Sequence, residues 1–219
     1  MISALAKRLR KTAAPASGFS LIELVVAMGI FTIFIAVLLT AIVSLTKGAT
    51  QSRATAESAS AVLNVFQNID RQVRYADAIN YPGQSTTTGY RYIEFRIPAA
   101  SAPKGYTTCM QWRYLPADNL IQSREWEDAT GSLASGWSTK VTSVVEDPAA
   151  PFPLTLVPGG GVIKQKLSLT VTAGDTSRNA TSKISTVYVA RNSSNASTNV
   201  ADANGQSVTP VCQRTAVRP

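Results

Sequence analysis

The sequence contains no histidine among its 219 residues. Without an imidazole, His-dependent acid–base catalysis and most zinc sites are excluded. The sequence also lacks a nucleophile–base pair, a nucleotide-binding motif and a cluster of metal ligands. The acidic residues Glu125, Glu127 and Asp128 lie near a predicted hairpin end, where we expect them to be solvated. We therefore predict that the protein is not an enzyme and has no catalytic residue, metal or cofactor.

Cysteine is scarce: only Cys109 and Cys212 occur, far apart and without metal-ligand spacing. An even pair in an exported domain favours a disulfide, and two separate free thiols are the alternative. A Cys109–Cys212 bridge would tie the C-terminal tail to a predicted strand. Closing a loop of ~100 residues contributes up to ~4–5 kcal/mol in the chain-entropy model.

Acidic residues are missing from the first 17 positions, which instead carry Lys7, Arg8, Arg10 and Lys11. These four charges are half of the formal net charge of +8. A sequence pI near 9.7 could indicate nucleic-acid binding. Because so much of the excess sits in one short leader, we favour a role in membrane topology instead.

Charge is also absent from the 22 residues Leu24–Leu45. As a helix this run is ~33 Å long, enough to cross a bilayer core of ~30 Å. Basic residues precede it, so the positive-inside rule keeps the leader in the cytoplasm and exports the C-terminal body. The run is longer than the apolar region of a signal peptide, and no small-x-small cleavage site follows it. A plain signal anchor is the alternative interpretation.

Glu23 is the single charge in the apolar segment that begins at Phe19. At mid-bilayer a carboxylate costs ~2.5–3.5 kcal/mol on insertion scales. It could reach the headgroups, or it could pair with a cation that the apolar helix does not supply. Cleavage after Gly18 would create such a cation, the α-amino group of Phe19. Glu23 of one subunit could then neutralise the terminal amine of its neighbour.

The string GFSLIELVVAMGIF, residues 18–31, resembles the class III signal of type IV prepilins and type II secretion pseudopilins. The resemblance implies that a membrane aspartyl prepilin peptidase cuts after Gly18 and methylates Phe19, and that Glu23 directs assembly. It also implies a single-pass protein of the cytoplasmic membrane that later enters a pilus or pseudopilus. The implied partners are membrane lipid, the peptidase, a membrane assembly platform and other pilin or pseudopilin subunits.

The sequence departs from many major pilins, because no proline occurs between Pro15 and Pro82 to kink the helix. The string Met28–Phe31 is more similar to minor pseudopilins of the J type and minor pilins of the PilW type. We therefore expect a structural minor subunit of a type IV pilus, type II secretion or competence filament.

The alternative function is a filament-tip module that binds DNA or a surface ligand. It is suggested by basic residues with tyrosine and tryptophan nearby, although a solvated sheet face explains them as well. These residues are Arg91, Arg96, Lys104, Arg113, Arg124, Lys140, Lys164 and Lys166.

The resemblance and the periodicity together predict an α+β fold, a long transmembrane helix that extends into an amphipathic spine under a mostly antiparallel sheet. Apolar residues at spacings of 4, 3, 4 and 3 form the spine: Val62, Phe66, Ile69, Val73 and Ala76. The helix should end before Tyr81-Pro82-Gly83.

Strands are predicted where apolar residues alternate with polar ones, such as Glu94 and Arg96 beside Ile93, Phe95 and Ile97. The expected strands are 93–97, 108–114, 120–126, 139–145, 163–172 and 184–190, with a proline-rich loop over 147–161 and a mobile segment over 192–206. The expected divisions are a cleaved leader (1–18), a transmembrane helix half (19–46), a soluble helix half (47–80), a β-rich domain (84–191) and a polar tail (192–219).

Overall fold

The computed structural model describes residues 18–84, 89–146, 153–157, 164–194, 207–208 and 210–212. The chain divides into two compact units, residues 1–49 and 50–219. Helix α2 (Leu21–Tyr75) is 55 residues long and is the only regular element in the described part of the first unit. Proline is absent from it, which agrees with its continuity. As predicted, α2 ends before Tyr81.

The second unit contains two antiparallel sheets in addition to the C-terminal part of α2. The larger sheet has the order β1-β3-β4-β5-β6, with β2 also pairing with β3. Its strands are β1 (Ala78–Ile79), β2 (Gly83–Gln84), β3 (Arg91–Ile97), β4 (Thr108–Leu115), β5 (Leu120–Glu127) and β6 (Ser138–Val141). The short helix η1 (Ala99–Ser101) lies in the connection between β3 and β4.

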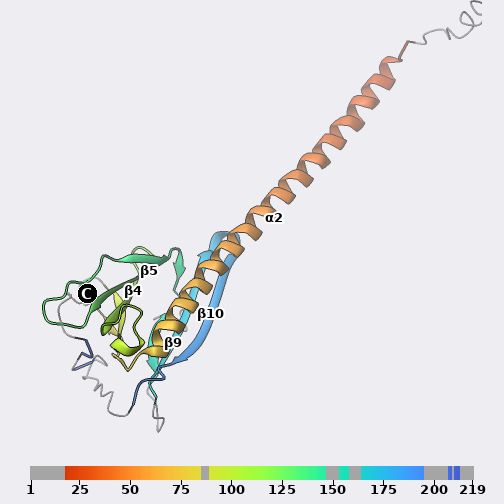
Figure 1. Ribbon diagram of the computed structural model, residues 1–219. Helices are drawn as coiled ribbons and strands as arrows, with labels where there is room; N and C mark the ends of the chain where they lie inside the picture. Colours follow the sequence, from red (N-terminus) through yellow and green to blue (C-terminus); the bar gives the residue numbers. More distant parts are fainter. Residues whose placement is uncertain are drawn as a thin grey trace, which may run out of the picture. The chain divides into compact units, whose positions relative to one another are not determined.

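The smaller sheet has the order β10-β9-β7, with β8 also pairing with β9. Its strands are β7 (Val144–Val145), β8 (Leu154–Val157), β9 (Lys166–Asp175) and β10 (Ala180–Val189). The short helix η2 (Thr176–Arg178) joins β9 to β10, and these two strands run alongside the C-terminal part of α2 (Figure 1). The α+β fold with a helical spine is therefore confirmed.

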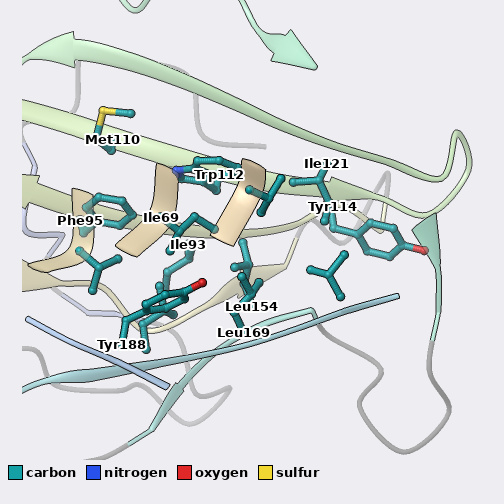
Figure 2. Packing of buried hydrophobic residues seen from close by; sticks show 14 of the residues in the cluster. Ile69, Ile93, Phe95, Met110, Trp112, Tyr114, Ile121, Leu154, Leu169 and Tyr188 are labelled. Atoms are coloured by element: carbon teal, nitrogen blue, oxygen red, sulfur yellow. The ribbon is translucent and has the colours of Figure 1, made fainter. Parts of the chain in front are cut away.

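One core joins the spine to both sheets. The predicted stripe is buried at Val62, Ile69, Val73 and Ala76, whereas Phe66 is only partly buried. The stripe also includes Val65, which the sequence pattern missed. Against it pack side chains of both sheets, including Ile93, Phe95, Trp112, Leu169 and Tyr188 (Figure 2).

Polar bonds fix the helix against this core. The Trp112 indole N–H donates to Oε1 of Gln72 at 2.9 Å, and the Tyr188 hydroxyl donates to the Phe66 carbonyl at 3.3 Å. Trp112 belongs to the larger sheet and Tyr188 to the smaller one. The C-terminal part of α2 is therefore held by both sheets.

The predicted strand over 139–145 was wrong, because the structure divides it between the two sheets. β6 ends at Val141 and β7 begins at Val144, and Ser143 between them has φ 55°. The Val144 N–H donates to the Asn119 carbonyl at 2.9 Å, which fixes this crossing. Strand β8 also lies inside the segment predicted as a loop over 147–161. Of the rest of that segment the structure describes Pro153, and residues 147–152 and 158–161 lie outside the described part of the chain.

Glu94, which alternates with the apolar residues of β3, is fully buried. Its carboxylate accepts hydrogen bonds from Asn80 Nδ2 and Gln111 Nε2, each at 3.2 Å. The reason is that the outer face of the larger sheet is itself covered. Cys109 on β4 is bonded to Cys212 with a Cα–Cα distance of 6.1 Å, and both pack with Trp126. The predicted disulfide is therefore present.

The start of the segment predicted to be mobile is well anchored. Ser193 is fully buried, its hydroxyl donates to the Ala190 carbonyl at 2.7 Å, and Asn192 Nδ2 donates to the Tyr75 carbonyl at 3.0 Å. The prediction therefore fails at these residues, and 195–206 lie outside the described residues.

Candidate processing and assembly site

The expected cleavage site lies immediately before α2. Gly18, Phe19 and Ser20 have no regular secondary structure, and the helix begins at Leu21. Its first hydrogen bond runs from the Leu24 N–H to the Ser20 carbonyl at 3.1 Å. Exposed chain outside secondary structure is where proteases cut most readily. The Gly18–Phe19 peptide bond is therefore accessible in the folded chain.

Glu23 lies in the first turn of α2 and is exposed. The amino end of a helix carries partial positive charge, so a carboxylate at this position is compatible with helix formation. Within residues 18–84 and the other described segments, Glu23 forms no ion pair. The structure places Phe19 and Glu23 at the same end of the helix without bringing them into contact. The part of the chain that the structure describes therefore supplies no cation for this carboxylate.

The surface of α2 in the first unit is apolar on every side. The most apolar window has a mean hydropathy of 2.7, and 0% of it is buried. Phe31 and Ile33, for example, are 64% and 67% exposed. A helix that is apolar all round is stable only when a membrane or other protein covers it. By length and composition, this helix can cross a membrane.

Two hydroxyl groups in this surface are already satisfied by the helix itself. Thr32 Oγ1 donates to the Met28 carbonyl at 2.8 Å, and Thr40 Oγ1 donates to the Ala36 carbonyl at 2.8 Å. A satisfied hydroxyl lowers the cost of burial in an apolar medium. The self-satisfied hydroxyl groups were not predicted from the sequence, although threonines inside an apolar helical run indicate them. Glu23 is therefore the polar side chain of this segment that most needs a partner.

The basic residues considered for DNA binding are largely engaged inside the second unit. Arg91 pairs with Glu146 at 2.6 Å, and Lys164 Nζ donates to the Ser193 carbonyl at 2.8 Å. Arg96 binds Asp77, with N–O distances of 3.1 Å, and its hydrogen bonds from the guanidinium to this carboxylate raise its pKa. These contacts leave fewer free cations on the surface than the sequence suggested.

Arg113 and Arg124 are held by aromatic rings rather than displayed as a free patch. Their guanidinium carbons lie 3.8 and 4.2 Å from the centroid of the Trp137 ring. Burial lowers the pKa of Arg113, which also donates to Gln122 Oε1 at 2.6 Å. Arg124 Nε donates to Gln111 Oε1 at 2.7 Å. Both side chains thus have structural roles in the outer layer of the larger sheet.

The acidic residues near the end of β5 are only partly solvated. Asp128 has a side chain that is 8% exposed and lies 3.9 Å from Arg96, so the expectation of solvation was wrong for this residue. Glu125 pairs with Lys104, and Glu127 is exposed. Among the residues that the structure describes, no group of His, Cys, Asp or Glu could hold a metal ion.

Comparison with known proteins identifies the N-terminal segment. Residues 14–39 match the family described as the prokaryotic N-terminal methylation motif. This stretch contains Gly18, Phe19 and Glu23 and the first half of the apolar helix surface. No curated protein and no solved structure matched the chain. The chain therefore carries a type IV pilin-like prepilin signal, with the motif at the start of a long apolar helix.

Proposed function

We propose that this prepilin is cut between Gly18 and Phe19 by a prepilin peptidase, methylated on Phe19, and assembled into a type IV pilus-like filament. One observation carries the proposal: the methylation motif coincides with an accessible peptide bond directly before a helix that is apolar on every side. The motif supplies the chemistry of processing. The exposed helix supplies a surface that has to be covered after processing.

Before assembly, α2 anchors the chain in the cytoplasmic membrane by a single pass. The leader (1–18) stays in the cytoplasm, residues 19–46 cross the membrane, and residues 47–80 continue outside it. The β-rich domain (84–191) and the polar tail (192–219) are exported. The Cys109–Cys212 disulfide supports this topology, because disulfides persist in oxidising compartments outside the cytoplasm.

Glu23 supplies the specificity of assembly. A helix that leaves lipid for a bundle of similar helices exchanges one apolar environment for another, so it gains little hydrophobic free energy. A carboxylate in lipid, in contrast, costs up to ~2.5–3.5 kcal/mol. The α-amino group of Phe19 on a neighbouring subunit removes this cost by forming an ion pair with Glu23. The pair also sets the register between adjacent helices.

In the filament the chain acts as a minor subunit, present in few copies near one end. The resemblance of Met28–Phe31 to minor subunits and the unbroken helix support this role. Its partners are other pilin or pseudopilin subunits and the membrane assembly platform. The machine is a type IV pilus, a type II secretion system or a competence filament.

Mass spectrometry of the mature chain tests the proposed function. The full chain is produced with an active prepilin peptidase, and in parallel with a catalytically inactive one. We expect a methylated N-terminus at Phe19 only with the active enzyme. A chain that still begins at Met1, or one that is cut at a different bond, would contradict the proposal.

A further inference from the structure

Strand β10 forms one edge of the smaller sheet, because it pairs with β9 and with no other strand in the described part of the chain. It is ten residues long, whereas β6, an edge strand of the larger sheet, has four residues. Its register with β9 continues over all ten residues without a bulge. β10 is therefore a long and regular edge, about 34 Å from end to end.

The pairing with β9 decides which backbone groups of β10 remain available. The Ala190 N–H donates to the Gln165 carbonyl at 3.0 Å, so these two residues form a hydrogen-bonded pair of the ladder. Hydrogen-bonded and non-hydrogen-bonded pairs alternate along an antiparallel ladder. The even-numbered residues of β10 therefore bond to β9. The odd-numbered residues direct their N–H and C=O groups to the other side: Thr181, Lys183, Ser185, Val187 and Val189.

This other side of β10 is open to solvent. All five odd-numbered residues are exposed. In the described part of the chain, four of them form no backbone hydrogen bond, and we call these four the free edge of β10: Thr181, Ser185, Val187 and Val189. Val187 and Val189 are 52% and 40% exposed, whereas Tyr188 between them is buried in the core. The free edge thus combines unpaired backbone groups with exposed apolar side chains.

The usual protection of a long edge is largely missing from β10. Proteins blunt such edges with proline, with charged side chains or with bulges. β10 contains no proline, and Lys183 is its single charged residue, so residues 184–189 carry no charge. A row of unpaired N–H and C=O groups is a template for another extended segment. The chemistry of the free edge therefore selects a β-strand as its partner.

β10 also follows the direction of the helix beside it. Near the start of β10, a Cβ on Gly174, the pairing partner of Thr181, would lie 2.9 Å from Ser58 Oγ. Just beyond its end, the Arg191 N–H donates to the Arg74 carbonyl at 3.1 Å. β10 and this part of α2 therefore run side by side in the same direction (Figure 1). Subunits whose helices pack side by side would bring their strands alongside the free edge.

We propose that a β-strand of a different pilin-type subunit pairs with the free edge of β10 and extends the smaller sheet. This pairing rests on the proposed function, in which other pilin-type subunits lie next to this chain. A minor subunit present in few copies meets such relatives, so the partner strand belongs to a different chain. The added strand bonds to the backbone of the free edge and places apolar side chains opposite Val187 and Val189.

Amide hydrogen exchange tests the pairing without any substitution. Exchange of the full chain is measured in detergent micelles, as the separate subunit, and in sheared filaments, with residue-level mass spectrometry of the β10 peptide. In the separate subunit the amides of Ser185, Val187 and Val189 should exchange quickly. In filaments they should exchange at least ~10-fold more slowly, because each gains a hydrogen bond. The amides of Ile184 and Thr186 bond to β9 in both states and are the internal control.

Photo-crosslinking in cells that assemble the filament identifies the partner. A benzophenone amino acid replaces Val187, whose Cβ would lie about 5 Å from that of its cross-strand neighbour. Mass spectrometry of the linked peptides should place the links on one β-strand of a protein that carries its own N-terminal methylation motif. The same amino acid at Leu133, which is 86% exposed in the loop after β5, is the control and should not link to that strand.

A proline at position 185 removes one donor from the free edge. Ser185→Pro and Ser185→Ala both lose the hydroxyl contact with Thr170 at 2.9 Å, but only proline lacks the N–H. This N–H points away from β9, so the subunit should keep its fold, which near-ultraviolet circular dichroism checks. Ser185→Pro should lower the cross-link yield about 5–30-fold relative to Ser185→Ala. The exchange measurement needs no variant and decides the question if the proline variant does not fold.

Four results would overturn the pairing: equally fast exchange of the odd-numbered amides in both states, no cross-link, links to a second copy of this chain or to a helix or loop, and equal yields from the two variants at position 185. The mass of the N-terminus is measured in the same samples. Processed chains in filaments with fast odd-numbered amides refute the pairing alone. Unprocessed chains with protected amides leave the pairing intact and refute the proposed function.

Discussion

Truncation of Ile69 to alanine provides a quantitative test of how α2 packs on the two sheets. Ile69 is fully buried in the shared core, whereas Leu63, six residues before it and on a different face of the helix, is 49% exposed. Replacing a buried isoleucine by alanine costs ~2–5 kcal/mol, because transfer free energy is lost and a cavity remains. The same truncation at a half-exposed site costs well below this range, since surface substitutions usually change stability by ~0.5 kcal/mol or less.

The assay has to report on the second unit alone. The first unit keeps its helix in a detergent micelle, so far-ultraviolet signals would be dominated by α2. All three tryptophans, Trp112, Trp126 and Trp137, lie in or beside the larger sheet, so near-ultraviolet circular dichroism follows the β-rich domain. At ~2–4 °C per kcal/mol for a unit of this size, Ile69→Ala should lower Tm by ~5–20 °C.

Leu63→Ala is the control on the same helix and should change Tm by ~2 °C or less. The Ile69 variant should also weaken the bond between Gln72 and the Trp112 indole, one turn further along. Equal effects of the two truncations would refute the orientation of α2, as would a larger effect at Leu63. Either result would mean that a different face of the helix covers the sheets.

Three further predictions concern the same unit. Reduction of the Cys109–Cys212 disulfide should destabilise the β-rich domain by up to ~4–5 kcal/mol, and the double alanine variant should match the reduced chain in thermal unfolding. Gly174→Ala should destabilise the domain in urea unfolding, because φ is 132° at this residue and the added Cβ would lie 2.2 Å from a backbone carbonyl oxygen of β10. Gly136→Ala is the control, since no atom lies within 4 Å of its new Cβ. Burial raises the pKa of the Tyr188 hydroxyl. The stability contributed by this neutral hydroxyl is therefore complete below the unfolded pKa of ~10 and is lost as the pH rises above it. Tyr188→Phe should reduce this alkaline loss of stability in unfolding midpoints measured between about pH 9 and 12.

The helix and its motif could be predicted from the sequence because their signals are local. One short stretch of chain contains all of them: Gly18, the single charge of Glu23 and an uncharged run of 22 residues. The spine was also predictable, since the apolar period of a helix marks its buried face without knowledge of the partner. The predicted burial of Phe66 was too high and that of Val65 was missed, because the buried stripe is wider than one residue per turn.

The outer layer of the larger sheet could not be predicted in this way. Alternation places Glu94 on a face that would normally be solvated, and the residues that cover this face, such as Cys212, lie more than a hundred positions away in sequence. Packing between residues that are far apart in the sequence produces no periodic pattern from which it could be predicted.

The division of the predicted strand over 139–145 has a different cause. A single residue, Ser143, adopts a left-handed backbone conformation and directs the chain from one sheet to the other. Serine has no strong preference for that conformation, which is usually occupied by glycine, asparagine or aspartate. The turn is imposed by the hydrogen bonds of the surrounding strands, so it could not be predicted from the residues next to Ser143.

The pairing of Glu23 with the new amine of Phe19 is the central claim, and the incorporation of a Glu23→Gln variant into filaments tests it most directly. The glutamine keeps the size of the side chain and removes its charge. Variant and wild-type chains are produced together, and the processed fraction and the sheared filaments are quantified by mass spectrometry. We expect normal cleavage at Phe19 and a loss of at least ~10-fold in incorporation. The loss follows because the terminal amine of the neighbouring subunit has no carboxylate to pair with, and an assembly free energy less favourable by ~1.4 kcal/mol or more lowers incorporation by this factor. Incorporation of Glu23→Gln at the wild-type level would contradict the claim.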